Sequence, residues 1–371
     1  MTLFPQRVHP TGMDVPRNSP LEPEKSGGRK KKKTKRKNKA KPSSEPPKPF
    51  SQFSKLPEKI QRQVFEYTFH LDSATGPALA LVCRKSNEWV EPLIYEYIVV
   101  NRFDRISPRP DRLWRTFSGS SKSREYFREH VKGILVNGMV DPVVTDLLSV
   151  CTKISTFACY AQSPLPDTIL EKLAAIFSVE EFPNLRHLSI SGLGFEAEEI
   201  RRAFFQKITH LAVDIGDDHQ CFPWSELKTH SCLTHILIDM HLELHENTPK
   251  EFKSTLLDIL SHTPPTLRCL VVLLDWDKLY ESFFQQKCDR AIFSDVINGK
   301  LDERVVVAAY TGDREEIDVT VIGEDPMRFL EYVGYVALAP DDTVPWMCPP
   351  GGLQKSIWER AEDVSRQRSA V

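Results

Sequence analysis

Residues 233–238 have the sequence LTHILI, with apolar residues at the first, fourth and sixth positions. This pattern occurs six times, and the starts of successive copies lie 23, 31, 23, 25 and 34 residues apart. Short segments with near-alternating apolar residues are typical of β-strands. The copies are VKGILV at 131–136, ISTFAC at 154–159, LRHLSI at 185–190, ITHLAV at 208–213, LTHILI at 233–238 and LRCLVV at 267–272.

Helix-like stretches lie between several of these strands, at residues 167–177, 195–205 and 250–262. A strand followed by a helix, repeated at this period, predicts a right-handed coil whose strands form a parallel sheet. The repeats are irregular and have no asparagine ladder. We therefore expect a degenerate leucine-rich-repeat-like α/β solenoid over residues 101–300, with an ordinary doubly wound α/β domain as the alternative.

A short all-helical unit is expected before the repeats, at residues 50–100. Residues 56–71, LPEKIQRQVFEYTFHL, space their apolar residues three to four apart, as an amphipathic helix does. A second apolar stripe runs through residues 73–98. The loop around Gly76 and Pro77 separates this second helical stretch from the first helix, and Pro92 marks a bend or a new first turn within it. Two or three helices of this size are too small to bury a core of their own.

The charge of the chain is divided between its two ends. The whole chain carries a formal charge of -2, but residues 1–50 carry +10, so residues 51–371 carry -12. Ten of the thirteen residues from 29 to 41 are basic, and such a run repels itself and cannot pack. We expect residues 1–49 to be a disordered basic tail that serves as a nuclear localisation signal or binds nucleic acid weakly. The signal residues are Arg29, Lys30, Lys31, Lys32, Lys33, Lys35, Arg36 and Lys37.

Residues 301–371 are expected to cap the open end of the solenoid, because a terminal repeat must cover its apolar face. Residues 352–368 place Leu353, Ile357, Trp358 and Ala361 on one side of an amphipathic stretch. The chain has no apolar signal segment, and its apolar runs are much shorter than the ~20 residues that a bilayer needs. We expect a protein of the nucleus, the cytoplasm or both.

Three sets of residues have types that catalysis or metal binding uses. Cys83 stands before two basic residues, but its place on the apolar stripe predicts a small buried side chain. His241 and His245 have neither of the spacings that zinc motifs use. Asp275 and Asp277 follow a predicted strand, where the expected role is a carboxylate rim on a binding surface.

No known catalytic motif accompanies these residues. The sequence has no nucleophile elbow, kinase signature or phosphate-binding loop. Its eight cysteines are scattered without a CxxC pair, which disfavours a zinc module or a disulfide framework. We expect neither enzymatic activity nor a cofactor or metal.

Residues 56–100 resemble an F-box, in particular the F-box-like proteins abundant in basidiomycete fungi. The resemblance lies in the opening Leu56-Pro57, in Ile60, in the pair Val64-Phe65 and in the segment LALVCRKSNEWVEPLIY, 79–95, followed directly by a strand. Lys59 stands where the family often has an acidic residue. The irregular leucine-rich-like region that follows fits the same family's arrangement.

This resemblance implies a substrate receptor of an SCF-type ubiquitin ligase. The F-box would dock on a Skp-type adaptor, which links it to a cullin and a RING subunit, and the solenoid would bind a protein target. The alternative is a nuclear scaffold or nucleic-acid-associated protein with an F-box-like fold and no ligase role. The adaptor-binding residues implied by the resemblance are Leu56, Pro57, Ile60, Val64, Phe65, Leu79, Val82, Trp89 and Leu93, some of which would instead pack the helices together.

Overall fold

The computed structural model describes thirteen segments of the chain. They are residues 53–101, 116–117, 119, 122–137, 142–160, 182–191, 205–216, 222–240, 248–275, 295–296, 299–310, 336–338 and 356–369. Residues 1–52 and 53–371 are separate units, and the fold below is that of the second. The predicted basic tail and localisation signal therefore lie outside the described residues, and the proposed domain boundaries stay predictions.

The described chain begins with a helical region, as the apolar spacing predicts. Its elements are the 3₁₀ helix η1 (Phe53–Lys55), α1 (Glu58–Leu71), the 3₁₀ helix η2 (Ser73–Thr75), α2 (Gly76–Ala80) and α3 (Arg84–Glu96). Pro57 occupies the N-cap of α1, and the Asp72 side chain accepts a hydrogen bond from the Ala74 N–H at the start of η2. These breaks make three short α-helices.

The second apolar stripe is divided between two helices. The chain leaves α2 after Ala80 and starts α3 at Arg84, so residues 81–83 are not helical. Pro92 lies inside α3 and starts no new helix, although it lacks the N–H that an interior residue donates.

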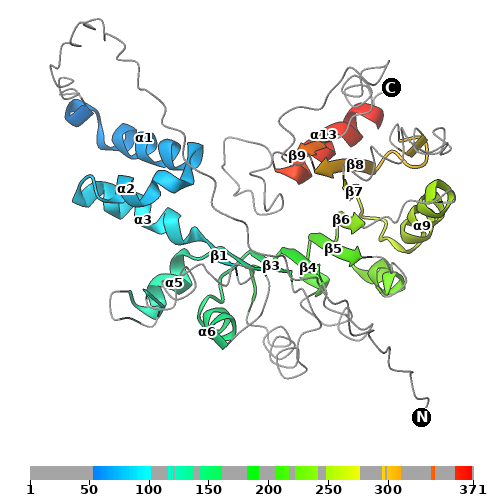
Figure 1. The fold of residues 1–371 in the computed structure, drawn as a ribbon, viewed down its shortest axis with the longest axis horizontal. Helices are drawn as coiled ribbons and strands as arrows, with labels where there is room; N and C mark the ends of the chain where they lie inside the picture. Colours follow the sequence, from blue (N-terminus) through cyan, green and yellow to red (C-terminus); the bar gives the residue numbers. More distant parts are fainter. Residues whose placement is uncertain are drawn as a thin grey trace, which may run out of the picture. The chain divides into compact units, whose positions relative to one another are not determined.

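Beyond the helices, the described residues form a mixed α/β fold with a nine-stranded parallel sheet. Each strand pairs with the next one along the chain, from β1 to β9 (Figure 1). A doubly wound sheet reverses its strand order, so the observed order excludes that alternative. The strands are β1 (Tyr97–Asn101), β2 (Gly133–Asn137), β3 (Thr156–Tyr160), β4 (His187–Ser191), β5 (His210–Gly216), β6 (His235–Met240), β7 (Cys269–Asp275), β8 (Val305–Tyr310) and β9 (Val336–Leu338).

All six copies of the repeated pattern form strands, β2 to β7, and each strand begins two residues after its copy starts. The first apolar residue of each copy is a buried anchor before the strand: Leu233 is 2% exposed and Leu185 is 1% exposed. The fourth and sixth residues point to the same side and join one hydrophobic core. The repeat therefore encodes one face of the sheet.

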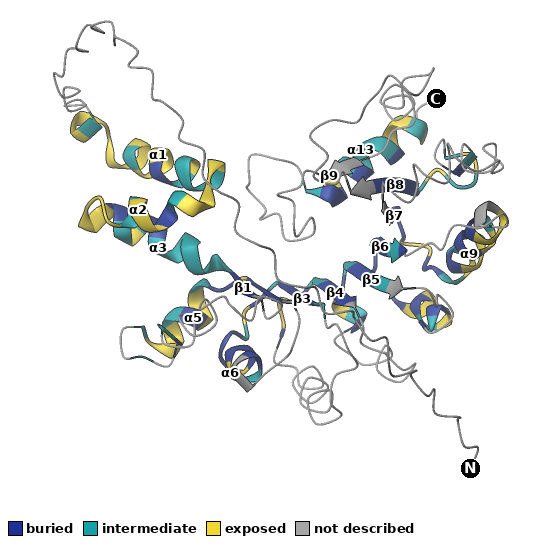
Figure 2. Ribbon diagram, in the orientation of Figure 1, coloured by how far each residue is buried: buried dark blue, intermediate teal, exposed yellow. Residues whose placement is uncertain are grey.

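Helices cover this face of the sheet. They are α5 (Arg124–His130), α6 (Pro142–Val150) and α9 (Thr248–His262), with the 3₁₀ helices η3 (Phe205–Lys207) and η5 (Trp224–Thr229). Figure 2 shows the strands mainly buried and α9 buried on one side. Helix α9 confirms the predicted helix at 250–262; that at 167–177 lies outside the described residues, as does most of that at 195–205.

Helix α13 (Ile357–Ser369) contacts strands β7, β8 and β9 on the opposite face of the sheet. Its residues Ile357, Trp358 and Ala361 are buried there with Val271 and Val306, as the amphipathic pattern indicated, while Leu353 lies outside the described residues. Because both faces of β7 and β8 are covered, these strands are apolar without alternation.

The junction between the helical region and the sheet has no linker. Helix α3 ends at Glu96 and β1 begins at Tyr97. The Lys132 N–H, just before β2, donates to the Glu96 carbonyl at 2.8 Å. The Tyr95 ring lies edge-on to the Phe127 ring of α5, with the ring centroids 5.6 Å apart. The helix is thus fixed to β1, to α5 and to the residue just before β2.

The central strands should tolerate little loss of volume. Ile236, in β6, is fully buried in the core. We expect Ile236→Ala to lower the free energy of unfolding by about 2–5 kcal/mol, because it removes buried methyl groups and leaves a cavity. Urea unfolding checks this, with Leu257→Ala, 46% exposed on α9, as the control. Equal urea midpoints for the two variants would contradict the assigned core.

Candidate functional site

Exposed apolar side chains are concentrated on the helical region. Among the described residues, seven of the nine exposed large hydrophobic side chains lie between residues 56 and 82. The seven are Leu56, Ile60, Val64, Tyr67, Leu71, Leu81 and Val82. Exposed apolar side chains gathered in this way are a common feature of protein-interaction surfaces. We call these seven residues the apolar docking surface.

One side of α1 carries much of this surface. Ile60, Val64 and Tyr67 line a shallow hollow of about 610 Å³ together with polar side chains of the same helix. Their exposed fractions are 41%, 44% and 52%. The outward side of α1 is correspondingly exposed in Figure 2.

The opposite side of α1 holds the helices together. Phe65 is 9% exposed, and its ring centroid lies 5.7 Å from that of Phe53 and 5.9 Å from that of Trp89 on α3. Phe65 and Trp89 therefore contribute to internal packing. An ion pair of 2.7 Å between Glu58 and Lys85 joins the two helices, but both side chains are more than half exposed, so it adds little stability.

The structure separates the nine residues that the F-box resemblance implies. Leu56, Pro57, Ile60, Val64 and Val82 are exposed. Leu79, Trp89 and Leu93 are half-buried, and Phe65 is buried. Sequence reasoning missed Tyr67, Leu71 and Leu81 as surface residues. The spacing of Ile60, Val64, Tyr67 and Leu71 carried that information for α1, whereas Leu81 is exposed because α2 ends before it.

The prediction that Cys83 is a buried hydrophobe is wrong. Cys83 is exposed and forms the extended N-cap of α3. Its N–H donates to the Ser86 Oγ at 2.9 Å, and the Ser86 N–H donates to the Cys83 Sγ at 3.4 Å. The hydrogen bonds from Ser86 lower the pKa of the thiol, with a small contribution from Lys85. The thiol therefore acts as a helix cap.

A second site lies on the face of the sheet that α13 covers. His187, His210 and His235 begin β4, β5 and β6 and are in register with one another. The ring centroids of His187 and His210 are 4.2 Å apart, and those of His210 and His235 are also 4.2 Å apart with nearly parallel planes. We call these three residues the histidine column.

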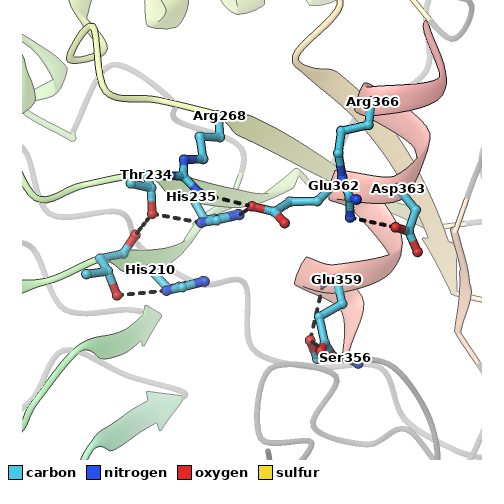
Figure 3. Close-up of polar contacts among 10 residues, drawn as sticks. His210, Thr234, His235, Arg268, Ser356, Glu359, Glu362, Asp363 and Arg366 are labelled. Atoms are coloured by element: carbon cyan, nitrogen blue, oxygen red, sulfur yellow. Dashed lines mark hydrogen bonds and ion pairs between the residues drawn. The ribbon is translucent and has the colours of Figure 1, made fainter. Parts of the chain in front are cut away.

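The residue before each of two histidines fixes its ring. The Thr209 Oγ1 lies 2.8 Å from Nδ1 of His210, and the Thr234 Oγ1 lies 2.9 Å from Nδ1 of His235. These contacts orient the two rings side by side and leave Nε2 directed away from the threonines, as Figure 3 shows for His210 and His235.

Helix α13 completes a pocket over the column. The Trp358 ring lies edge-on to His210 at a centroid distance of 5.1 Å. Oε1 of Glu362 lies 3.0 Å from Nε2 of His235 and 3.9 Å from the Arg268 guanidinium (Figure 3). The pocket has a volume of about 500 Å³ and is lined by the histidine column, Thr209, Thr234, Arg268, Ser356, Trp358, Glu359 and Glu362.

Burial keeps the histidine column neutral at pH 7. Burial, and to a smaller degree the charge on His235, lowers the pKa of His187 to about 4. Burial, and then the neighbouring His187 and His235, holds the pKa of His210 well below its usual range. Burial also lowers the pKa of His235, although Glu362 opposes this. At pH 7 the imidazoles therefore serve as hydrogen-bonding groups.

The described residues include no group of three or more His, Cys, Asp or Glu that could hold a metal ion. The histidine column lacks that geometry because its rings stack and do not converge on one point. His241, His245 and Asp277 lie outside the described residues, and Asp275 ends β7. The sequence showed the histidines within the repeats RHL, THL and THI, but only the strand register brings them together.

The comparisons with known proteins add no family. Neither the protein-family models nor the curated proteins contain a match to this chain.

No helix in the described part of the chain has both the length and the apolar character needed to span a membrane.

The histidine column predicts a loss of stability on acidification. A histidine whose pKa is lower in the folded than in the unfolded state stabilises fully above the unfolded value of 6.5. That stability falls as the pH drops toward the folded value, by about 1.4 kcal/mol per pH unit for each such histidine. We expect His210→Phe, which keeps a ring but does not titrate, to show a shallower loss between about pH 6.5 and 4.5.

Urea unfolding at several pH values measures this loss. His262→Gln, on a partly exposed position of α9, is the control and should follow the wild type. If His210→Phe and the wild type lose stability equally on acidification, the column does not control the acid response.

Proposed function

We propose that this protein is the substrate-recognition subunit of an SCF-type ubiquitin ligase, with an F-box-like helical region and a degenerate leucine-rich-repeat-like solenoid. The observation that carries the proposal is the apolar docking surface, seven exposed hydrophobic side chains on the helical region alone. Such a surface is costly in water unless a partner buries it. The partner proposed is a Skp-type adaptor, which would recruit a cullin and a RING subunit.

The surface has the composition of a protein interface. Its side chains are leucine, isoleucine, valine and one tyrosine, which supply apolar area at little cost in desolvated charge. Phe65 and Trp89 pack α1 against α3 on the side away from the exposed residues. The exposed residues would therefore already be in place when a partner binds. A few such anchors usually provide most of the affinity of an interface.

The repeats support the other half of the proposal. Parallel strands paired in chain order stack the repeats into an extended array, and arrays of this kind often bind protein targets. A receptor of this kind needs no catalytic residue, because it acts by raising the effective concentration of a target near the conjugating enzyme. This agrees with the absence of catalytic motifs from the sequence.

Binding to a fungal Skp-type adaptor tests the proposal. We expect the wild type to bind the adaptor in a pull-down and Leu56→Ala/Val64→Ala to bind about tenfold or more weakly, because interface anchors carry most of the affinity. Both side chains are exposed, at 36% and 44%, so the fold should be unaffected. Leu257→Ala is the control for loss of an exposed apolar side chain elsewhere. Absence of adaptor binding by the wild type would refute the proposal.

The basic run at residues 29–41 favours a second candidate, a nuclear scaffold or nucleic-acid-associated protein without a ligase role. Deletion of this run separates the two roles of the tail. We expect the deletion to abolish nuclear accumulation while adaptor binding is unchanged, because the cluster suits an acidic import receptor. Fluorescence imaging and the adaptor pull-down measure both effects. Loss of RNA or DNA retention, with nuclear accumulation intact, would instead favour the second candidate.

A further inference from the structure

The pocket between the histidine column and α13 carries two acidic groups with spare hydrogen-bonding capacity. Glu359 accepts hydrogen bonds from the Ser356 N–H and Oγ through Oε2 alone. Glu362 contacts His235 and Arg268 through Oε1 alone. Within the described part of the chain, each carboxylate thus keeps one oxygen without a protein donor. Both residues line the pocket from the same side, since they lie three positions apart on α13.

Positive charge in the pocket does not balance these carboxylates. The histidine column is neutral at pH 7, because burial lowers the pKa values of its imidazoles. Arg268 is the one lysine or arginine among the described residues that line the pocket. Its side chain is 70% exposed, and it lies 3.9 Å from one oxygen of Glu362. The lining therefore has a net negative charge.

Trp358, which lines the same pocket, has a buried polar group without a partner. The indole lines the pocket and is 4% exposed, yet its N–H has no hydrogen-bond partner in the described structure. Buried donors of this kind normally have an acceptor. A peptide brings backbone carbonyls, which are acceptors, together with its side chain, whereas a bare metal cation brings none.

We propose that this pocket binds a basic side chain, lysine or arginine, of a polypeptide target. The side chain would place its cationic head between Glu359 and Glu362 and its aliphatic stem against the histidine column and Trp358. A volume of about 500 Å³ accommodates such a side chain with part of its backbone. The proposal rests on the proposed function, since it names the chemistry of the target that the receptor selects.

The charge of the rest of the protein agrees with a basic target. Residues 51–371 carry -12, which attracts a basic polypeptide before contact. An acidic peptide would instead meet two carboxylates and a single guanidinium. The aromatic ring of Trp358 also favours a cation over an anion.

Peptide retention on the immobilised full-length protein tests the proposal. The probes are pools of heptapeptides, acetylated and amidated so that their termini are uncharged, with lysine or arginine as the only charged residue. Matched pools carry norleucine or citrulline, which keep the shape without the charge, or glutamate. We expect the basic pools to be retained about tenfold or more over the neutral ones, the size of a charge-assisted hydrogen bond. The lysine and arginine pools distinguish the two sources of the cation.

Two isosteric substitutions locate the binding to the pocket. Glu359→Gln and Glu362→Gln remove a charge but keep an amide oxygen that accepts from Ser356 or His235, so α13 stays in place. We expect each to lower retention of the basic pools about tenfold. Asp363→Asn is the matched control: it removes the same charge on the same helix, but Asp363 pairs with Arg366 and does not line the pocket (Figure 3).

Three results would overturn the inference: equal retention of basic and neutral pools, preference for the glutamate pool, or an equal effect of Asp363→Asn. The assay contains no adaptor, so its outcome is separable from that of the pull-down. Retention of basic peptides without adaptor binding would support the proposed pocket and refute the ligase role. Adaptor binding without peptide retention would support the ligase role and refute the proposed pocket.

Discussion

The in-register pairing of each strand with the next one along the chain is the constraint on which the rest of the structure depends. A single strand of this sheet has apolar residues on one side and no means of burying them. The next repeat supplies the neighbouring strand, and the helices α5, α6 and α9, in the described segments between strands, cover the apolar side. The buried anchor before each of the strands β2 to β7, such as Leu185 or Leu233, ties the incoming segment to this core. Stability is thus shared among neighbours and is not located in any one repeat.

Much of this fold could be predicted from the sequence, because the repeated pattern states directly which residues face the core. The strands β2 to β7, the helix α9 and the parallel order all follow from spacing alone. The position of α13 could not be predicted in this way, because an amphipathic pattern shows which side of a helix is apolar but not which apolar surface that side will contact. Side chains such as Val271 and Val306 gave no separate signal within uniformly apolar strands.

The candidate sites show where spacing fails. The apolar spacing on α1 predicted a stripe, but whether a stripe is covered depends on what packs against it, and only Phe65 of α1 is buried. Cys83 was misplaced because two short helices were read as one, and its exposure follows from the break between them. The histidine column needed the register of three strands, which no single segment encodes. In each case the missing information is tertiary.

The direct passage from α3 into β1 has a consequence for any partner that covers the helical region. Many two-part proteins join their modules by a tether, and the distance between bound partners is then an average over many conformations. Here Glu96 and Tyr97 are consecutive, and the Glu96 carbonyl accepts a hydrogen bond from Lys132, in the first copy of the repeated pattern. The angle between two bound partners would be set by the backbone geometry at the junction of α3 and β1. The relative orientation of two bound partners would therefore be nearly fixed. The distance between them would depend on the number of repeats that separate their binding sites.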